Sequence, residues 1–386
     1  MPGFEVFGEE ERKAINSLFD KNGGVLFAHG FETTRKGVYC VREFERVFAK
    51  RFGTPHAQAV SSGTAALKVG LKALGVAPGD EVITQSFTFI ATVEAILDVG
   101  ATPVVVDIDD TLNICPKSLE AAITDKTKVI LPVHMMGAAA DMDSVIALAT
   151  KHRLKVLEDT AQACGGSYKG RLLGTIGHVG AFSTDAGKTI TTGEGGMVLT
   201  ANQDVHIQAR ALHDHGHEYN SKLGRAEEGA LMWGFNYRMT ELQGAIGAVQ
   251  LSKLDYILER QRENKRKLKA ALDERCFTFR SLLDPEGDIG DTVVIFLETA
   301  EQAKHLVTGM RDASLGTKNL PDAIRWHFAD YWDHIFPIPE SPPSEKRWKQ
   351  SAELLERAIA LPVMVNMTDE AINIAASTLN RIVKQL

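Results

Sequence analysis

Short apolar segments alternate with amphipathic ones between about residue 57 and residue 200, and this alternation constrains the fold more than any other feature. Seven apolar segments predict buried strands, over 56–62, 81–85, 102–108, 128–133, 154–158, 180–183 and the segment GMVLT that ends at Thr200. Helical periodicity follows several of them, as in 63–75, 88–100 and 141–152. Buried strands alternating with helices are typical of a parallel sheet covered on both faces. We therefore predict an α/β fold with a mainly parallel seven-stranded sheet between helices.

The pattern changes after about residue 250. A helical segment over 239–272 has few breakers, and its charged second half predicts a solvated linker. Beyond it we expect a strand, a helix, a proline-rich loop and a terminal helix capped by Thr368, over 292–299, 300–313, 337–346 and 368–386 respectively. This organisation predicts a large α/β domain over 1–250, followed over 251–386 by the linker helix and a smaller α+β domain.

Composition excludes several classes of function. The chain has 43 basic and 50 acidic side chains, a net charge of −7, which argues against nucleic acid as the main partner. It has no apolar stretch of about 18 residues that would span a membrane, and its acidic beginning is unlike a signal peptide. The four cysteines are scattered without a CxxC pair, which argues against structural zinc and fits a cytoplasmic location.

Ligands of open α/β sheets bind beyond the carboxyl ends of the strands, so the residues that follow each strand are the candidates for a site. Gly63, Thr64 and Ala65 follow the first strand and open a helix, whose N-terminus suits a phosphate. An ordinary capped turn is the alternative. Phe89 follows the second strand, either as a stacking aromatic or as a core residue.

Two charged residues follow later strands. Asp159 ends the fifth strand, where a buried carboxylate needs a cationic partner or ligand; a helix N-cap is the alternative. Lys188 lies in a glycine-containing loop after the sixth strand, and a surface lysine is its alternative. The segment GKT at 187–189 is not a P-loop, because Phe182 replaces the required glycine and no helical pattern follows. A phosphate site, an aromatic face, a carboxylate and a lysine together match pyridoxal 5′-phosphate, whose aldehyde forms a Schiff base with lysine.

Longer segments carry a family resemblance. The chain resembles the DegT/DnrJ/EryC1/StrS family, sugar aminotransferases among the fold-type-I pyridoxal phosphate enzymes, in the segments 61–67, 79–97, 132–143, 157–183, 188–200 and 234–251. These segments cover most of residues 1–255, and the likeness is looser beyond them. The resemblance implies the fold-type-I transferase fold and pyridoxal 5′-phosphate as the cofactor.

The resemblance also implies roles for single residues around the cofactor ring. Lys188 corresponds to the lysine that forms the Schiff base, and Asp159 to the residue that pairs with the pyridinium nitrogen. Gln162 corresponds to a residue beside the ring, and Phe89 to an aromatic that stacks on it.

The phosphate contacts follow from the same resemblance. They are expected from Gly63, Thr64, the Ala65 amide and Ser183. Asn236 corresponds to an asparagine that reaches the phosphate of the neighbouring subunit, which implies a homodimer with shared active sites.

The substrate side departs from the family pattern. Thr184 stands where an aromatic is usual, and small residues follow it up to Lys188. His215 and Arg238 are the candidates for substrate contact. His213, His215 and His217 raise a metal hypothesis, but no carboxylate or cysteine motif completes the set, so we expect no metal.

The implied reaction moves an amino group from L-glutamate, which leaves as 2-oxoglutarate, to a keto sugar used for cell-surface polysaccharide such as lipopolysaccharide. Segments 1–8, 184–191, 213–220 and 325–335 resemble family members that aminate 8-oxo-3,8-dideoxy-manno-octulosonate; a nucleotide-linked keto-deoxy sugar is the other candidate. A sugar dehydratase, which carries histidine in place of the lysine, and a non-catalytic cofactor-binding regulator are the alternatives. Lys188 favours the transaminase.

Overall fold

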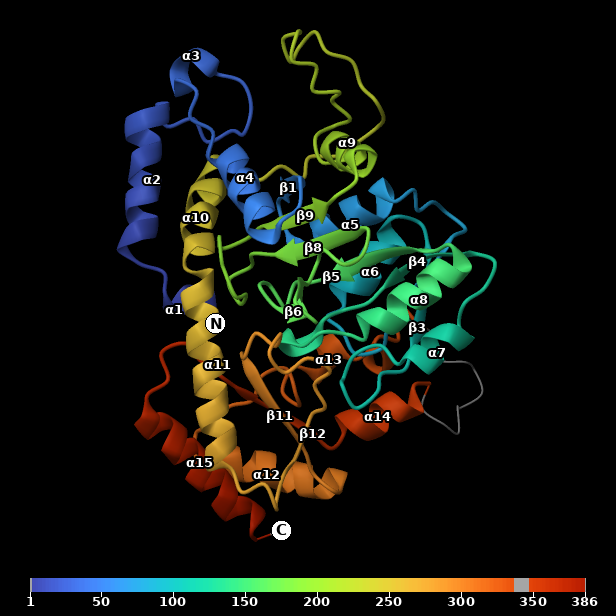
Figure 1. Cartoon of the computed structure of the whole chain (residues 1–386), viewed down its shortest axis with the longest axis vertical. Helices are drawn as coiled ribbons and strands as arrows, with labels where there is room; N and C mark the ends of the chain where they lie inside the picture. Colours follow the sequence, from blue (N-terminus) through green and yellow to red (C-terminus); the bar gives the residue numbers. More distant parts are fainter. Residues whose placement is uncertain (1, 337–346, 386) are drawn as a thin grey trace.

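The computed structural model describes residues 2–336 and 347–385, and the predicted loop over 337–346 lies outside the described residues. Its main sheet has seven strands in the order β1-β9-β8-β5-β4-β2-β3 (Figure 1). Their bounds are β1 His56–Val60, β2 Glu81–Gln85, β3 Thr102–Val106, β4 Thr127–Leu131, β5 Lys155–Asp159, β8 Val179–Ser183 and β9 Gly196–Thr200. All pairs from β3 to β8 are parallel, whereas β9 is antiparallel to both of its neighbours. The predicted mainly parallel sheet is confirmed, and each predicted strand coincides with one of these.

Helices cover both faces of the sheet, because successive strand residues point to opposite sides. Val82 of β2 packs in one core with α5, α6 and α9, whereas the next residue, Ile83, packs in another core with α7 and α8. The bounds are α5 Gly63–Ala73, α6 Ala91–Asp98, α7 Pro116–Ala121, α8 Met142–His152 and α9 Gln203–Leu212. Helix α4 (Cys40–Phe52) covers the β1–β9 end of the sheet (Figure 1). Short strands β6 (Ser167–Tyr168) and β7 (Arg171–Leu172) form a hairpin beside the main sheet.

The segment predicted as one helix over 239–272 forms two, α10 (Glu241–Ser252) and α11 (Leu254–Ala271), which meet at Lys253. The prediction that its charged half is a solvated linker is wrong for one face. Leu254, Ile257, Leu258 and Leu268 of α11 are buried, since apolar residues three and four apart share one side of a helix. The charged residues occupy the other side.

The C-terminal residues build a small antiparallel sheet against α11. Its order is β10-β11-β12, with bounds Thr278–Phe279, Thr292–Phe296 and Ala358–Pro362. Helices α12 (Ala300–Asp312) and α15 (Asp369–Val383) pack with it, while α13 (Ile324–His327) and α14 (Lys349–Leu355) lie closer to the main sheet. Thr368 caps α15 as predicted, since its Oγ1 accepts from the Ala371 amide at 3.1 Å. The division into domains at residue 250 stays a prediction.

The N-terminal helices α1 (Pro2–Glu5) and α2 (Glu9–Asn22) lie beside α10, and α3 (Glu32–Arg35) lies above α2, beyond the N-terminal end of α10 (Figure 1). An irregular loop over 213–240 joins α9 to α10 and rises next to α3. In the described part of the chain, every helix is too short or too polar to cross a membrane.

Candidate active site

A cavity of about 400 Å³ lies beyond the carboxyl ends of β1, β2, β5 and β8. Seven of the predicted site residues line it, namely Gly63, Thr64, Phe89, Asp159, Gln162, Ser183 and Lys188. They come together because parallel strands end at the same edge of the sheet. Of the candidate residues in the first 190 positions, all except Ala65 therefore line one cavity.

The N-terminus of α5 forms one wall of this cavity. Ser62 caps the helix, and its Oγ accepts from the Ala65 amide at 3.1 Å. In this structure the Ala65 amide, whose predicted contact with a phosphate stays a prediction, donates to Ser62, and the amides of Gly63 and Thr64 have no acceptor within the helix. A Cβ atom at Gly63 would lie 2.7 Å from Cβ of Ser183, so only glycine lets the helix end approach this serine. Two amides and a hydroxyl so placed suit a phosphate.

Gly63→Ala is expected to raise the dissociation constant of pyridoxal 5′-phosphate by roughly tenfold or more, because the added methyl group must push the helix end away from Ser183. Titration of cofactor absorbance or protein fluorescence measures this constant. Gly316→Ala is the matched control, since its Cβ would meet open space, and it should bind the cofactor normally. Unchanged affinity of Gly63→Ala would show that this approach does not form the phosphate site.

Asp159 contributes a buried carboxylate to the cavity wall. Its Oδ1 accepts from the Ala161 amide at 3.1 Å and its Oδ2 from Thr92 Oγ1 at 2.9 Å. Burial raises the pKa of this carboxyl, while those two hydrogen bonds oppose the rise. The N-cap alternative is wrong, because no α-helix follows β5 before β6. A carboxylate in this setting matches a cationic ring nitrogen.

Lys188 faces the same cavity from the loop between β8 and β9. Within residues 2–336 and 347–385, its Nζ has no hydrogen bond or ion pair. Burial lowers the pKa of the Lys188 amine, against the opposing effect of the Asp159 and Asp185 carboxylates. The lysine is therefore a cavity residue and not a surface residue, and a lowered pKa makes its amine a better nucleophile.

Phe89 is 43% exposed although it is a large apolar residue, and it lines the cavity. Its ring centroid lies 5.4 Å from that of His327. The alternative in which Phe89 packs in the core is therefore wrong. An aromatic face open to the cavity suits a flat heteroaromatic ligand.

Comparison with known proteins identifies the family. A sequence model of the DegT/DnrJ/EryC1/StrS aminotransferase family matches residues 30–380. The chain belongs to this family. The spore coat polysaccharide biosynthesis protein SpsC of Bacillus subtilis is 34% identical over 355 residues, 89% of this chain and 90% of that protein. GDP-perosamine synthase of Caulobacter vibrioides is 44% identical over 218 residues, 55% of this chain and 56% of that protein. The crystal structure of an aminotransferase from Psychrobacter cryohalolentis, 29% identical, superposes with a TM-score of 0.85 and covers 98% of each chain.

This DegT/DnrJ/EryC1/StrS aminotransferase is an enzyme that uses pyridoxal 5′-phosphate. The cavity fits this cofactor at each of its polar ends. The N-terminus of α5 with Ser183 suits the phosphate, the buried carboxylate of Asp159 suits the pyridinium nitrogen, and the unpaired amine of Lys188 suits the aldehyde.

Four further residues line the cavity of this aminotransferase from the C-terminal part of the chain, and the sequence patterns did not indicate them: Asp291, Lys318, Asn319 and His327. Lys318 forms an ion pair with Asp291. Burial alone would raise the pKa of Asp291, but the Lys318 ammonium holds it below its ordinary value. These residues follow no strand end of the main sheet, so no local pattern could have connected them with the site.

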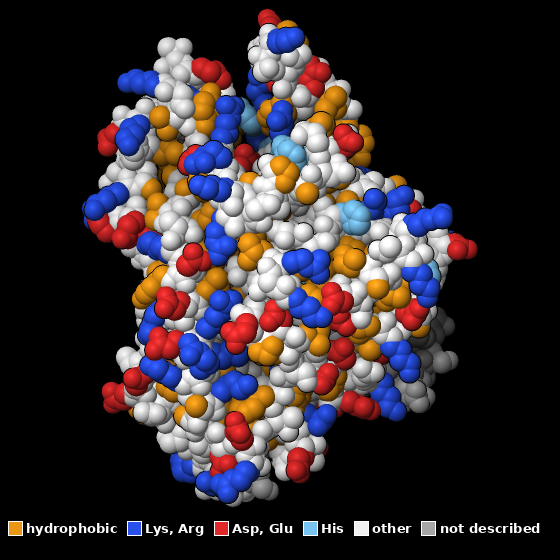
Figure 2. Space-filling model, in the orientation of Figure 1, with side chains coloured by type: hydrophobic (Ala, Val, Ile, Leu, Met, Phe, Trp, Pro, Cys, Tyr) orange, Lys and Arg blue, Asp and Glu red, His pale blue; other side chains and the backbone are white. Residues whose placement is uncertain are grey.

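The remaining predicted residues lie elsewhere. Asn236 and His215 are exposed on the loop over 213–240, and neither lines the cavity that contains Lys188. Arg238 lines a second cavity, of about 790 Å³, between this loop and the N-terminal segment. Figure 2 shows that cavity as a notch beside α3, with basic and histidine side chains along it.

The three histidines of the metal hypothesis do not converge. His213 is buried with its Nε2 3.1 Å from Nε2 of Gln58, His215 is exposed, and His217 pairs with Glu228 at 3.3 Å. Among the described residues, no group of three or more His, Cys, Asp or Glu side chains is placed to hold a metal ion.

Proposed function

We propose that the enzyme transfers the amino group of L-glutamate to a keto sugar during the synthesis of a cell-surface polysaccharide, in the cytoplasm. The observation that carries the transaminase assignment is the presence of Lys188 and Asp159 in one cavity that the exposed ring of Phe89 also lines. Pyridoxal 5′-phosphate, when bound, supplies an electron sink for the carbon that carries the transferred nitrogen.

Each residue of the cavity has a role in this proposal. The Lys188 amine, displaced by the amino donor, takes and returns the proton at the reacting carbon as general base and general acid. Asp159, ionised beside a cationic ring, keeps the proton on the ring nitrogen. The amides of Gly63 and Thr64 and the hydroxyl of Ser183 hold the phosphate. Phe89 covers the ring, and Gln162 lies beside it.

The sugar class rests on the relatives and on the opening of the cavity. One relative is named for a GDP-linked product and another for spore coat polysaccharide, which supports a sugar acceptor. The alternative acceptor, 8-oxo-3,8-dideoxy-manno-octulosonate, is supported by the resemblance of segment 325–335, which contributes His327 to the cavity wall. Ala186 and Gly187, the small residues that precede Lys188, are exposed.

The acceptor is tested by converting the enzyme with L-glutamate, removing 2-oxoglutarate and adding keto sugars one at a time. We expect one class, nucleotide-linked or ulosonate, to restore the original absorption spectrum with formation of an amino sugar. Deoxygenation of the sugar without glutamate turnover would instead support the dehydratase, and no turnover with any donor would support a cofactor-binding regulator.

We further propose a homodimer in which Asn236 binds the cofactor phosphate of the partner subunit. Asn236 is exposed and lies outside the cavity of its own chain, so a second copy can receive it. Lys188→Ala and Asn236→Ala should each be inactive as homodimers. Unfolded and refolded together, they should recover about a quarter of the wild-type activity, because half of the random dimers are hybrids with one intact site. A mixture as inactive as its components would show that each site is built from one chain.

A further inference from the structure

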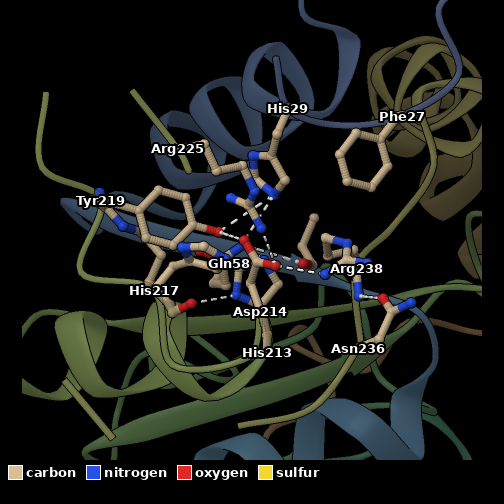
Figure 3. Close-up of polar contacts among 12 residues, drawn as sticks. Phe27, His29, Gln58, His213, Asp214, His217, Tyr219, Arg225, Asn236 and Arg238 are labelled. Atoms are coloured by element: carbon tan, nitrogen blue, oxygen red, sulfur yellow. Dashed lines mark hydrogen bonds and ion pairs between the residues drawn. The ribbon is translucent and has the colours of Figure 1, made fainter. Parts of the chain in front are cut away.

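The carboxylate of Asp214 is the centre of a buried cluster that the proposed reaction does not use. The residue is 0% exposed. Its Oδ2 accepts from Tyr219 Oη at 2.6 Å and lies 3.1 Å from His29 Nε2. Its Oδ1 accepts from Arg225 Nη2 and Arg238 Nη1, both at 2.5 Å. Figure 3 shows the four side chains converging on this one carboxylate.

The cluster joins the N-terminal segment to two parts of the loop over 213–240. His29 belongs to the N-terminal segment, Tyr219 and Arg225 to the tip of the loop, and Arg238 to its return towards α10. The ring of Phe27 lies over the guanidinium of Arg238, at 5.1 Å from its centroid to Cζ. The loop is therefore held to its own N-terminal segment through Asp214.

Asn236 is fixed by the same cluster from two sides. Its backbone forms an antiparallel bridge with that of Asp214, flanked by a hydrogen bond from the His215 amide to the Phe235 carbonyl at 3.0 Å. Its Oδ1 accepts from the Arg238 amide at 3.4 Å, and the side chain of Arg238 is bound to Asp214. The position of Asn236 thus depends on Asp214 through both the backbone and a neighbouring side chain.

The charge of Asp214 is what holds the cluster together. Burial alone would raise its pKa, but hydrogen bonds from His29 and Arg225 hold the pKa far below its ordinary value. The carboxylate is therefore ionised at physiological pH and offsets two guanidinium groups. Without it, Arg225 and Arg238 would repel each other in a partly buried place, and the loop would lose its common anchor.

We propose that Asp214 is a positioning residue that acts across the subunit interface, holding Asn236 where it completes the cofactor site of the partner subunit. This inference rests on the shared-site homodimer proposed above. Asp214 cannot touch the partner's cofactor itself, because its side chain is fully buried within its own chain.

Asp214→Asn keeps the shape of the side chain and removes its charge. We expect its homodimer to bind pyridoxal 5′-phosphate about tenfold more weakly or worse, since a misplaced binding group loses most of its effect. Cofactor titration of the purified dimer measures this independently of turnover. Asp288→Asn is the matched control: Asp288 is a buried carboxylate, paired with Lys265 at 2.6 Å, and its variant should bind the cofactor as the wild type does.

Hybrid dimers decide whether the effect crosses the interface. A refolded mixture of Asp214→Asn and Lys188→Ala should recover activity through its hybrids, because one site then combines an intact Lys188 with an intact Asp214. Suppose that the mixture of Lys188→Ala and Asn236→Ala recovers activity but the mixture of Lys188→Ala and Asp214→Asn does not. The role of Asp214 would then be refuted, while the shared active site would stand. Failure of both mixtures would overturn the shared site itself.

Circular dichroism and gel filtration establish that each variant is a folded dimer. If Asp214→Asn does not fold, Arg225→Met takes its place, because it removes one donor and leaves the carboxylate with Tyr219, His29 and Arg238. The same weakening and the same rescue by Lys188→Ala are expected of it, and weakening without rescue contradicts the proposal.

Discussion

Lys188→Ala is expected to lower the rate of glutamate-dependent amination by roughly 10³-fold or more, because it removes both the nucleophile and the base from the cavity. Lys188 lines the cavity, burial lowers the pKa of its amine, and within the described residues that amine has no hydrogen bond or ion pair. The variant should still bind pyridoxal 5′-phosphate through α5, Ser183 and Asp159. It should lack the visible absorption of the lysine-linked cofactor, and borohydride should attach nothing to the peptide that contains position 188.

The control for this experiment is Lys151→Ala. Lys151 is an exposed lysine on α8, paired with Glu120 at 2.8 Å, and its loss should leave both rate and spectrum unchanged. Turnover retained by Lys188→Ala would refute the assignment of the catalytic lysine and with it the proposed reaction.

Asp159→Asn is expected to lower kcat by about 10²-fold or more while the amino donor still binds, because a neutral amide does not stabilise a protonated ring nitrogen. The amide oxygen can keep the hydrogen bond from the Ala161 amide, and the new amide N–H can donate to Thr92 Oγ1, so the shape of the site is preserved. Stopped-flow spectra with L-glutamate measure the rate of the first half-reaction directly.

Asp159→Asn should lower kcat, but it should not lower the thermal stability of the cofactor-free protein. Burial raises the pKa of Asp159 in the cofactor-free protein, so the folded state holds this proton more tightly than the unfolded state does. Its contribution to stability is present at low pH and is lost as the pH rises through the unfolded and then the folded pKa. At pH 7 the cofactor-free variant should therefore melt at the same temperature as the wild type or higher. Asp143→Asn, which removes an exposed carboxylate near Lys169, should change neither rate nor melting temperature. A lower melting temperature together with normal kcat would contradict both expectations.

The fold of the large sheet and the principal residues of the site could be predicted from the sequence, because both depend on local patterns. Strand segments are recognised by their apolar runs, and the residues that end parallel strands meet at one edge of the sheet. Gly63, Asp159 and Lys188 satisfy this rule, and they share one cavity. The match of the DegT/DnrJ/EryC1/StrS family model over residues 30–380 confirms the family that the sequence resembles.

Other features depended on packing between distant segments, which no local pattern records. Helix α11 buries one face although its sequence is highly charged, and Lys318 and His327 reach the cavity from beyond the main sheet. The amide of Ala65 is taken by Ser62, a choice between two neighbouring acceptors that only the coordinates decide.

The loop over 213–240 is the clearest example of a feature that packing between distant segments decides. Its histidines looked like a metal motif, whereas the tertiary structure makes Asp214, the residue between two of them, the centre of the cluster. A carboxylate in a sequence can serve as a cap, a surface charge or a buried anchor. Which of these it becomes depends on the cations that the rest of the fold brings to it, since the cost of burying a charge is recovered only by partners in space.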